Sequence, residues 1–206
     1  MTRDAKLLRR VFFNRDPRIV ARELLGKLIV RREGRKKLAG RIVEVEAYLG
    51  AGDLAAHAAA GHTARNAVLW GPPGHAYVYF IYGVHYCLNI SCLPDGDAGC
   101  VLIRALEPVS SMREMAKARG LADLDLTSVR DLRKLASGPG KLCEALGITR
   151  PRDNAKDMLL PTSDLQVMGD GFRVDEVAIT QRIGITKSAE MPLRYVIAGN
   201  DFTSKK

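Results

Sequence analysis

The sequence predicts a single domain in which β-strands and α-helices are mixed. At 206 residues with 47% hydrophobic content, the chain can fill one sizeable core, and no linker or internal repeat divides it. Residues 41–48 alternate with a period of two, as expected of a strand with two different faces. Asp16-Pro17, and Ser111 with Glu114 three residues later, are typical of helix starts. We therefore expect one domain over residues 1–206.

Cap, turn and hydrophobic signals place the elements along the chain. Asp53 is expected to cap a brief alanine-rich helix that carries His57, and Gly83 to supply the turn of a hairpin. Residues 199–206 are expected to be a frayed tail. The remaining predictions are a helix over 17–25, strands over 27–32 and 38–48, a loop over 61–70, a hairpin over 75–91, a strand over 100–109, helices over 111–120, 127–135 and 139–146, and strands over 165–168, 172–180 and 193–198.

Composition limits the kinds of partner and the cellular compartment to be expected. Thirty-two Lys and Arg against 23 Asp and Glu give a net charge of +9, which favours either affinity for a polyanion or a merely basic protein. No apolar run is long enough to span a bilayer, and Arg9 and Arg10 interrupt any signal peptide, so we expect a cytoplasmic protein, nucleoid-associated in a prokaryote, without membrane contact. The four cysteines lack a CxxC pair and are expected to be buried, reduced thiols.

A carboxylate pair and one arginine are the first candidates for a site. Glu44 and Glu46 could form a solvated strand face, but Tyr48 shares their parity, and a carboxylate beside an aromatic ring also suggests a pocket for a small molecule or a base. Arg104 interrupts an apolar strand, where its charge is costly unless paired. It either faces a carboxylate or reaches solvent from an edge strand.

The predicted hairpin tip is unusual. It carries Tyr82, Val84 and His85 instead of the small polar residues of an ordinary turn, and a large ring at an apex is suited to insertion between stacked bases. Gly140 and Lys141, in a Gly-Pro-Gly-Lys segment at a helix start, could contact a phosphate or simply begin the helix. The histidines and cysteines lack the spacing of a metal site, and no Walker loop or dinucleotide fingerprint is present, so no metal or cofactor is expected.

The motifs, taken together, resemble a known family. RIVEVEAYLG, AAH, TARNAVLWGPPGHAYVYFIYGVHYCLNIS, CVLIRALEP, SGPGKLCEALGI and PLRYVIAG occur in the order found in the alkyladenine (3-methyladenine) DNA glycosylases, also called methylpurine glycosylases. The resemblance covers about residues 10–199. It implies an α+β fold, with a curved antiparallel sheet surrounded by helices and a protruding hairpin that enters the DNA minor groove.

The resemblance also assigns roles to residues. Glu46 matches the general base of the family, and Arg104 the arginine that helps to hold the catalytic water. The family's base-stacking pocket corresponds to Tyr48, His57 and Tyr79. Asn89 matches the asparagine that narrows the pocket against the exocyclic amine of guanine.

Tyr82 matches the intercalating tyrosine of the family. Val84 and His85 complete the tip, and His85 stands where other members can have an aromatic residue, so a weaker or pH-dependent wedge is expected. The turn over residues 94–99 also varies in length within the family.

The expected function is excision of damaged purines from double-stranded DNA by a monomeric, monofunctional glycosylase. An ionised Glu46 could deprotonate water and stabilise the positive charge that develops on the sugar. Alkylated purines such as 3-methyladenine are the expected substrates, whereas hypoxanthine or ethenoadenine would need an acid that the sequence does not identify. A damage-binding protein without catalysis, and an RNA-binding or formyl-group-recognising module, are the alternatives.

Overall fold

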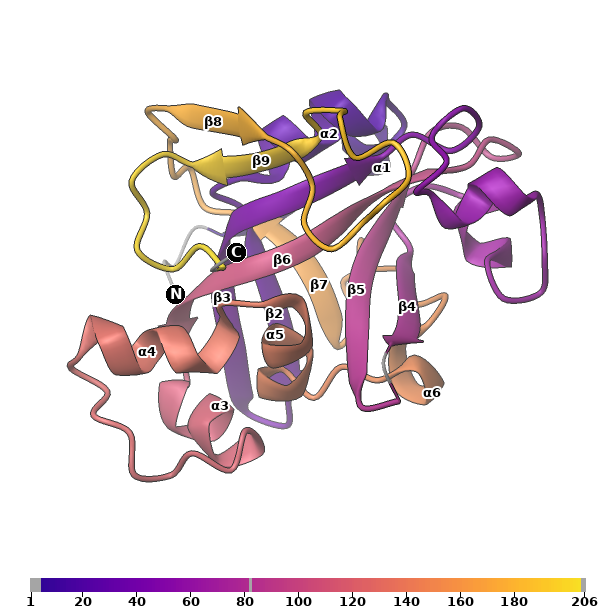
Figure 1. The fold of residues 1–206 in the computed structure, drawn as a ribbon. Coiled ribbons are helices and arrows are strands. Elements are labelled where there is room, and N and C mark those ends of the chain that lie inside the picture. Colours follow the sequence, from indigo (N-terminus) through magenta and orange to yellow (C-terminus); the bar gives the residue numbers. More distant parts are fainter. Residues whose placement is uncertain (1–4, 82, 205–206) are drawn as a thin grey trace.

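The computed structural model describes residues 5–81 and 83–204, which form one domain around an antiparallel sheet (Figure 1). The main strand order is β1-β7-β2-β3-β6-β5-β4, and β9 pairs with both β3 and β8. The strands of the described residues are β1 (Lys6–Leu7), β2 (Leu28–Glu33), β3 (Lys36–Tyr48), β4 (Ala76–Ile81), β5 (His85–Cys92), β6 (Gly99–Ser110), β7 (Leu165–Gly169), β8 (Val177–Thr180) and β9 (Arg194–Ile197). The predicted α+β class is confirmed.

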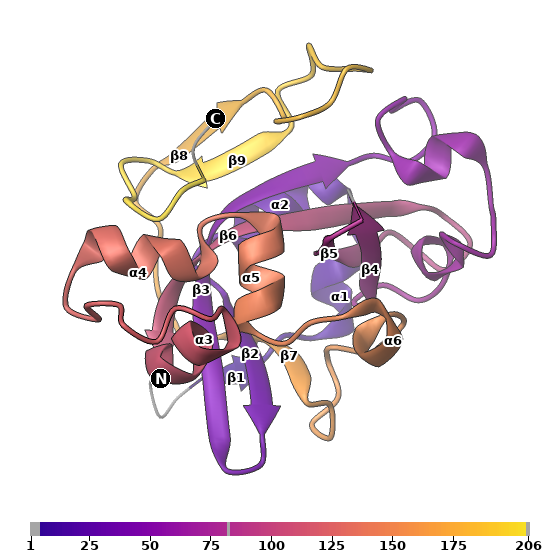
Figure 2. The ribbon, with the colours of Figure 1, turned by 60° about the horizontal axis from the view of Figure 1, so that its bottom comes forward.

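Short helices lie around this sheet (Figure 2). A 3-10 turn over 57–60 and another over 67–70 follow β3, and the second lies in the segment expected to be loop. The α-helices are α1 (Arg10–Phe13), α2 (Pro17–Leu24), α3 (Met112–Ala118), α4 (Val129–Ala136), α5 (Pro139–Ala145) and α6 (Arg150–Asp153). No helix within these ranges is long and apolar enough to cross a membrane.

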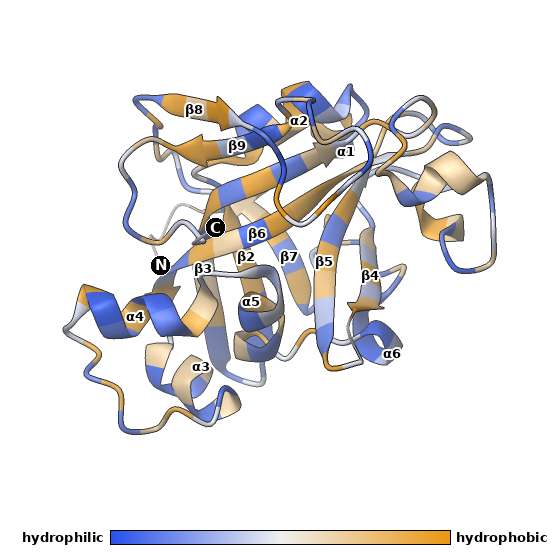
Figure 3. Ribbon diagram, viewed as in Figure 1, coloured by the Kyte–Doolittle hydropathy of each residue, from blue (hydrophilic) through white to orange (hydrophobic). Residues whose placement is uncertain are grey.

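The core lies between the sheet and the helices. The central strands are mostly apolar because their side chains contribute to this core (Figure 3). Leu24 of α2, Ile42 of β3, Ile103 of β6 and Leu142 of α5 are all fully buried in the same cluster. Because both faces of β3 and β6 are covered, neither strand has the solvent-exposed face of an amphipathic strand. Polar side chains on these strands are therefore forced inward.

Two predicted helix caps are wrong. Ser111 has a left-handed backbone (φ 56°), and its hydroxyl donates to the carbonyl of Lys37, while Glu114 pairs with Lys36, so no capping box forms. Asp53 does not cap the turn over 57–60 either, because Ala56 occupies that position. At Ser111 a distant partner displaces the local hydrogen bond that the spacing suggested, whereas Asp53 accepts local hydrogen bonds from the amides of Leu49 and Ala55, before the 3-10 turn begins.

The C-terminal segment also differs from the expected frayed tail. Phe202 is buried, and Ser204 donates hydrogen bonds from its amide and its hydroxyl to the carboxylate of Glu44. The strand expected over 172–180 is restricted to β8, residues 177–180. The four cysteines are buried and unpaired, as predicted.

Candidate active site

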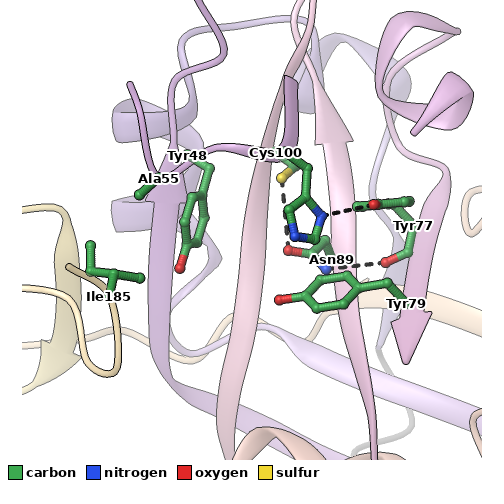
Figure 4. Close-up of a pocket in the computed structure, with 8 residues that line it drawn as sticks. Tyr48, Ala55, Tyr77, Tyr79, Asn89, Cys100 and Ile185 are labelled. Carbon is green, nitrogen blue, oxygen red and sulfur yellow. Dashed lines mark hydrogen bonds between the residues drawn. The ribbon is translucent and has the colours of Figure 1, made fainter. Parts of the chain in front are cut away.

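A pocket lies at one end of β3, where four of the predicted residues meet. Tyr48 ends β3, Tyr79 comes from β4, Asn89 from β5, and His57 from the 3-10 turn (Figure 4). Tyr48 and Ile185 line one side, and Tyr77 and Tyr79 line the other. The remaining lining residues are Ala55 and Cys100. The structure thus brings together residues that are 41 positions apart in sequence, from Tyr48 to Asn89.

The aromatic wall is held by edge contacts. The His57 ring lies 4.5 Å from the Tyr79 ring, centroid to centroid, and its Nδ1 is 2.8 Å from the Tyr77 hydroxyl. Burial lowers the pKa of His57 below its ordinary value of 6.5, and the nearby charge of Arg65 lowers it further. Burial also raises the pKa of Tyr77 to about 12. The wall is therefore uncharged at neutral pH.

The Asn89 amide is fixed at the inner end of the pocket. Its Nδ2 donates to the Tyr77 carbonyl at 3.2 Å, and its Oδ1 accepts from the Cys100 thiol at 3.7 Å. Burial raises the pKa of Cys100 to about 12, which keeps this thiol protonated. Because both ends of the amide have partners, Asn89 forms a rigid boundary.

Glu46 lies directly behind Tyr48 and is fully buried. Its Oε1 accepts from the Ile183 amide at 2.8 Å and contacts Arg104 Nη1 at 3.1 Å, while its Oε2 accepts from the Tyr48 hydroxyl at 3.0 Å. A carboxylate offers about four lone-pair sites. Three donors therefore leave about one site, on Oε2, for a water molecule.

Arg104 joins the two glutamates of β3. Its Nε donates to Glu44 Oε1 at 2.9 Å, and Arg194 Nε donates to the same oxygen at 2.8 Å. Burial would raise the pKa of Glu44, but the hydrogen bonds from Arg194 and Ser204 outweigh it and hold this pKa below its ordinary value. The solvated-face reading of the glutamates is wrong, as is an edge-strand arginine, since β6 lies between β3 and β5.

A buried pair that the sequence did not indicate supports Tyr48. Arg182 donates to both carboxylate oxygens of Asp53, at 2.6 and 2.8 Å, and its guanidinium lies 4.7 Å from the centre of the Tyr48 ring. Burial would raise the pKa of Asp53, but the hydrogen bond from Arg182 lowers it overall. The pair is separated by 129 residues in sequence, and no local pattern indicated it.

The predicted DNA-inserting tip joins β4 and β5, which pair in an antiparallel manner. Val84 is 66% exposed, as a wedge residue would need to be, and Tyr82 lies outside the described residues. His85 Nδ1 is 2.9 Å from Glu144 Oε1 of α5.

The predicted phosphate-binding residues lie beside this tip. Gly140 packs so closely on the His85 ring that an added Cβ would lie 2.9 Å from its Cγ, and Lys141 is exposed next to it. Within the described ranges, no group of three His, Cys, Asp or Glu side chains is placed to hold a metal ion.

Comparison with known proteins identifies the family. The family model described as methylpurine-DNA glycosylase matches residues 11–201. A Koribacter versatilis protein provisionally named 3-methyladenine DNA glycosylase is 65% identical over 199 residues, which cover 97% of this chain and 93% of that protein. Relatives with the same provisional name from Methanoculleus marisnigri and Alkaliphilus oremlandii are 45% and 41% identical, over 95% and 97% of this chain and 97% and 99% of their own lengths. The chain therefore belongs to the methylpurine-DNA glycosylase family.

Proposed function

We propose that this protein is a monofunctional base-excision enzyme that rotates alkylated purines, such as 3-methyladenine, out of duplex DNA and hydrolyses their N-glycosidic bond. It belongs to a family of hydrolases that act on N-glycosyl bonds, and the proposal extends this to the substrate and the roles of residues. The observation that carries it is Glu46, a buried carboxylate with about one free lone-pair site, immediately behind a pocket walled by aromatic rings.

The aromatic wall selects which bases bind in the pocket. A base must leave the duplex to reach the pocket, at a cost of roughly a few kcal/mol that is lowest for damaged or mispaired bases. Between Tyr48 and Tyr79, a flat cationic purine gains about 0.5–2 kcal/mol per ring contact. Asn89, held rigid by Tyr77 and Cys100, limits the inner end of the pocket and would exclude the exocyclic amine of guanine.

Glu46 and Arg104 supply the chemistry. Glu46 accepts a proton from a water molecule at Oε2, and the water oxygen attacks the anomeric carbon as the bond to the purine nitrogen breaks. The bonding electrons leave with the purine, and an alkylated purine is already cationic and leaves readily. The negative carboxylate stabilises the developing oxocarbenium charge, and Arg104 holds Glu46 in position from its other oxygen.

The proposal includes an abasic product with an intact backbone. No lysine is among the described residues that line the base pocket itself, which favours hydrolysis over Schiff-base chemistry. Hypoxanthine and ethenoadenine are proposed as slower substrates, because a neutral leaving group needs protonation. We further propose that Val84, together with Tyr82, fills the space that the base vacates, and that the enzyme acts on duplex DNA as a monomer.

The test is Glu46→Gln in a single-turnover assay with duplexes containing an alkylated purine, with EDTA present. Base release should fall by at least about 100-fold, the lower end of what a positioned acid or base contributes, while lesion affinity is retained. Glu33→Gln, which changes an exposed glutamate at the end of β2 that pairs with Arg152, is the matched control and should release base at the wild-type rate. Tight lesion binding by the wild-type protein without any base release would instead indicate the non-catalytic damage-binding alternative.

A further inference from the structure

A second groove adjoins the base pocket. It shares Ala55, His57 and Tyr77 with the pocket wall, so the two hollows lie next to each other. Its outer part is lined by two cationic side chains, Arg65 from the segment after the 3-10 turn and Lys187 from the connection between β8 and β9. These two residues are 122 positions apart in sequence (187 − 65), so the fold brings them to one groove.

The charges of the two cations are available to an anion. Both side chains are exposed, and neither forms an ion pair with a carboxylate among the residues that the structure describes. Other arginines near the site already form ion pairs: Arg182 pairs with Asp53, and Arg104 pairs with the two glutamates of β3. The charge of Arg65 reaches the pocket, because it lowers the pKa values of both His57 and Tyr77.

The covalent structure of the DNA strand indicates which anion would lie in this groove. A base held in the pocket keeps its sugar at the pocket mouth, and each side of that sugar carries a phosphodiester. We propose that Arg65 and Lys187 form a binding site for a phosphodiester next to the everted nucleotide, and so hold the strand while its base is in the pocket. This inference rests on the proposed function, since it requires a nucleotide in the pocket. It adds a local interaction to the general attraction that the +9 charge provides.

The experiment is a double-mutant cycle between protein and DNA, carried out on the Glu46→Gln background so that the lesion stays intact. Lesion duplexes are made with ordinary phosphates or with a neutral methylphosphonate on either side of the lesion. Arg65→Gln with Lys187→Gln should weaken binding to the ordinary duplex and reduce the salt dependence, by about 0.9 in the slope of log K against log salt for each phosphate that is no longer neutralised. On the methylphosphonate duplex, the same double variant should cause less than twofold further loss of affinity, because the phosphate charge is already missing.

Arg35→Gln is the matched control, since Arg35 is also exposed but lies on the turn between β2 and β3. Figures 1 and 2 both place that turn well away from the segment that follows β3. This variant should respond to the methylphosphonate as the parent protein does. If the double variant lost as much affinity on the methylphosphonate duplex as on the ordinary one, the phosphodiester site would be refuted. Failure of the proposed function is distinguishable, because the protein with Glu46 intact would then release no base from any duplex.

Discussion

At the scale of single residues, the pocket combines a charged interior with an uncharged wall. Glu46 and Glu44 both contact the guanidinium of Arg104, whereas His57, Tyr77 and Tyr79 face the pocket without charge. Burial raises the pKa of Tyr79 far above its ordinary range. A cationic purine would therefore meet neutral, electron-rich rings, with the negative carboxylate behind them. A positive charge on the wall would oppose that arrangement.

His57 makes this arrangement sensitive to acid. Its pKa is depressed, so the ring is neutral at neutral pH and gains a proton only as the pH falls below about 6.5. The charged ring would then repel a cationic purine by more than about 1 kcal/mol. We expect the affinity of the Glu46→Gln protein for a 3-methyladenine duplex to fall at least about fivefold from pH 7.5 to 5, as measured by fluorescence anisotropy.

Two comparisons isolate the ring in that titration. A duplex with neutral ethenoadenine should show a smaller pH effect, and His57→Asn should remove the difference between the two lesions. An equal response of both lesions in the presence of His57 would mean that the ring does not titrate against the base.

At the scale of elements, the end of β3 is fixed by a close approach of two loops. Gly50 has φ +83°, and a Cβ added there would lie 1.8 Å from the backbone oxygen of Ala98, just before β6. Only glycine permits both the backbone angle and the close approach. This approach holds Tyr48 and Cys100, two residues that line the pocket, on adjoining chain segments.

Gly50→Ala should therefore destabilise the protein much more than an ordinary glycine substitution. Gly61→Ala is a close control, because Gly61 has the same φ of +83° but nothing within 4 Å of an added Cβ. Gly61→Ala should cost about 1–2 kcal/mol for the left-handed backbone alone. Gly50→Ala should cost at least about 1 kcal/mol more, measured by urea unfolding. Equal losses of stability would show that the loops separate readily.

At the scale of the whole molecule, β3, which carries both buried glutamates, depends on residues far along the chain. Glu44 accepts hydrogen bonds from Arg194 of β9 and from Ser204, which is 160 residues away. β9 also pairs with β3 at the two glutamates. The conformation of Glu44, and through Arg104 that of Glu46, is therefore coupled to the last strand and the segment after it.

Ser204→Ala tests that coupling. It removes one hydroxyl donor, 2.8 Å from a buried charged acceptor, and should lower the free energy of unfolding by about 1.5–3 kcal/mol. Base release should slow as well. Thr203→Val is the control, since the neighbouring hydroxyl donates to the neutral carbonyl of Asn200, and it should cost about 0.5–1.5 kcal/mol. A Ser204→Ala protein as stable as Thr203→Val would argue against the coupling.

The distance in sequence between interacting residues separates the contacts that the sequence could predict from those that it could not. An arginine in an apolar strand must be paired. The apolar strand around Arg104 therefore sufficed to predict a carboxylate partner. Strand alternation and turn residues likewise placed β2, β3 and the β4–β5 pair. By contrast, the Asp53–Arg182 pair and the Ser204 hydrogen bonds join distant segments without a local signal. The incorrect cap at Ser111 has the same cause, since its hydroxyl donates to the distant Lys37 carbonyl instead of a local group.

The dependence of β3 on residues 182–204 has a consequence for synthesis in the cell. Domains form from the N-terminus as a chain is translated, and β3 emerges early. Its glutamates obtain their partners at Ile183, Arg194 and Ser204 only when these late segments leave the ribosome. A stalled or prematurely terminated product would carry the aromatic wall and Glu46 but would lack the Ile183 hydrogen bond to Glu46 and the Arg194 and Ser204 hydrogen bonds to Glu44. Unfinished chains would thus lack the fully assembled site, which forms only in completed molecules.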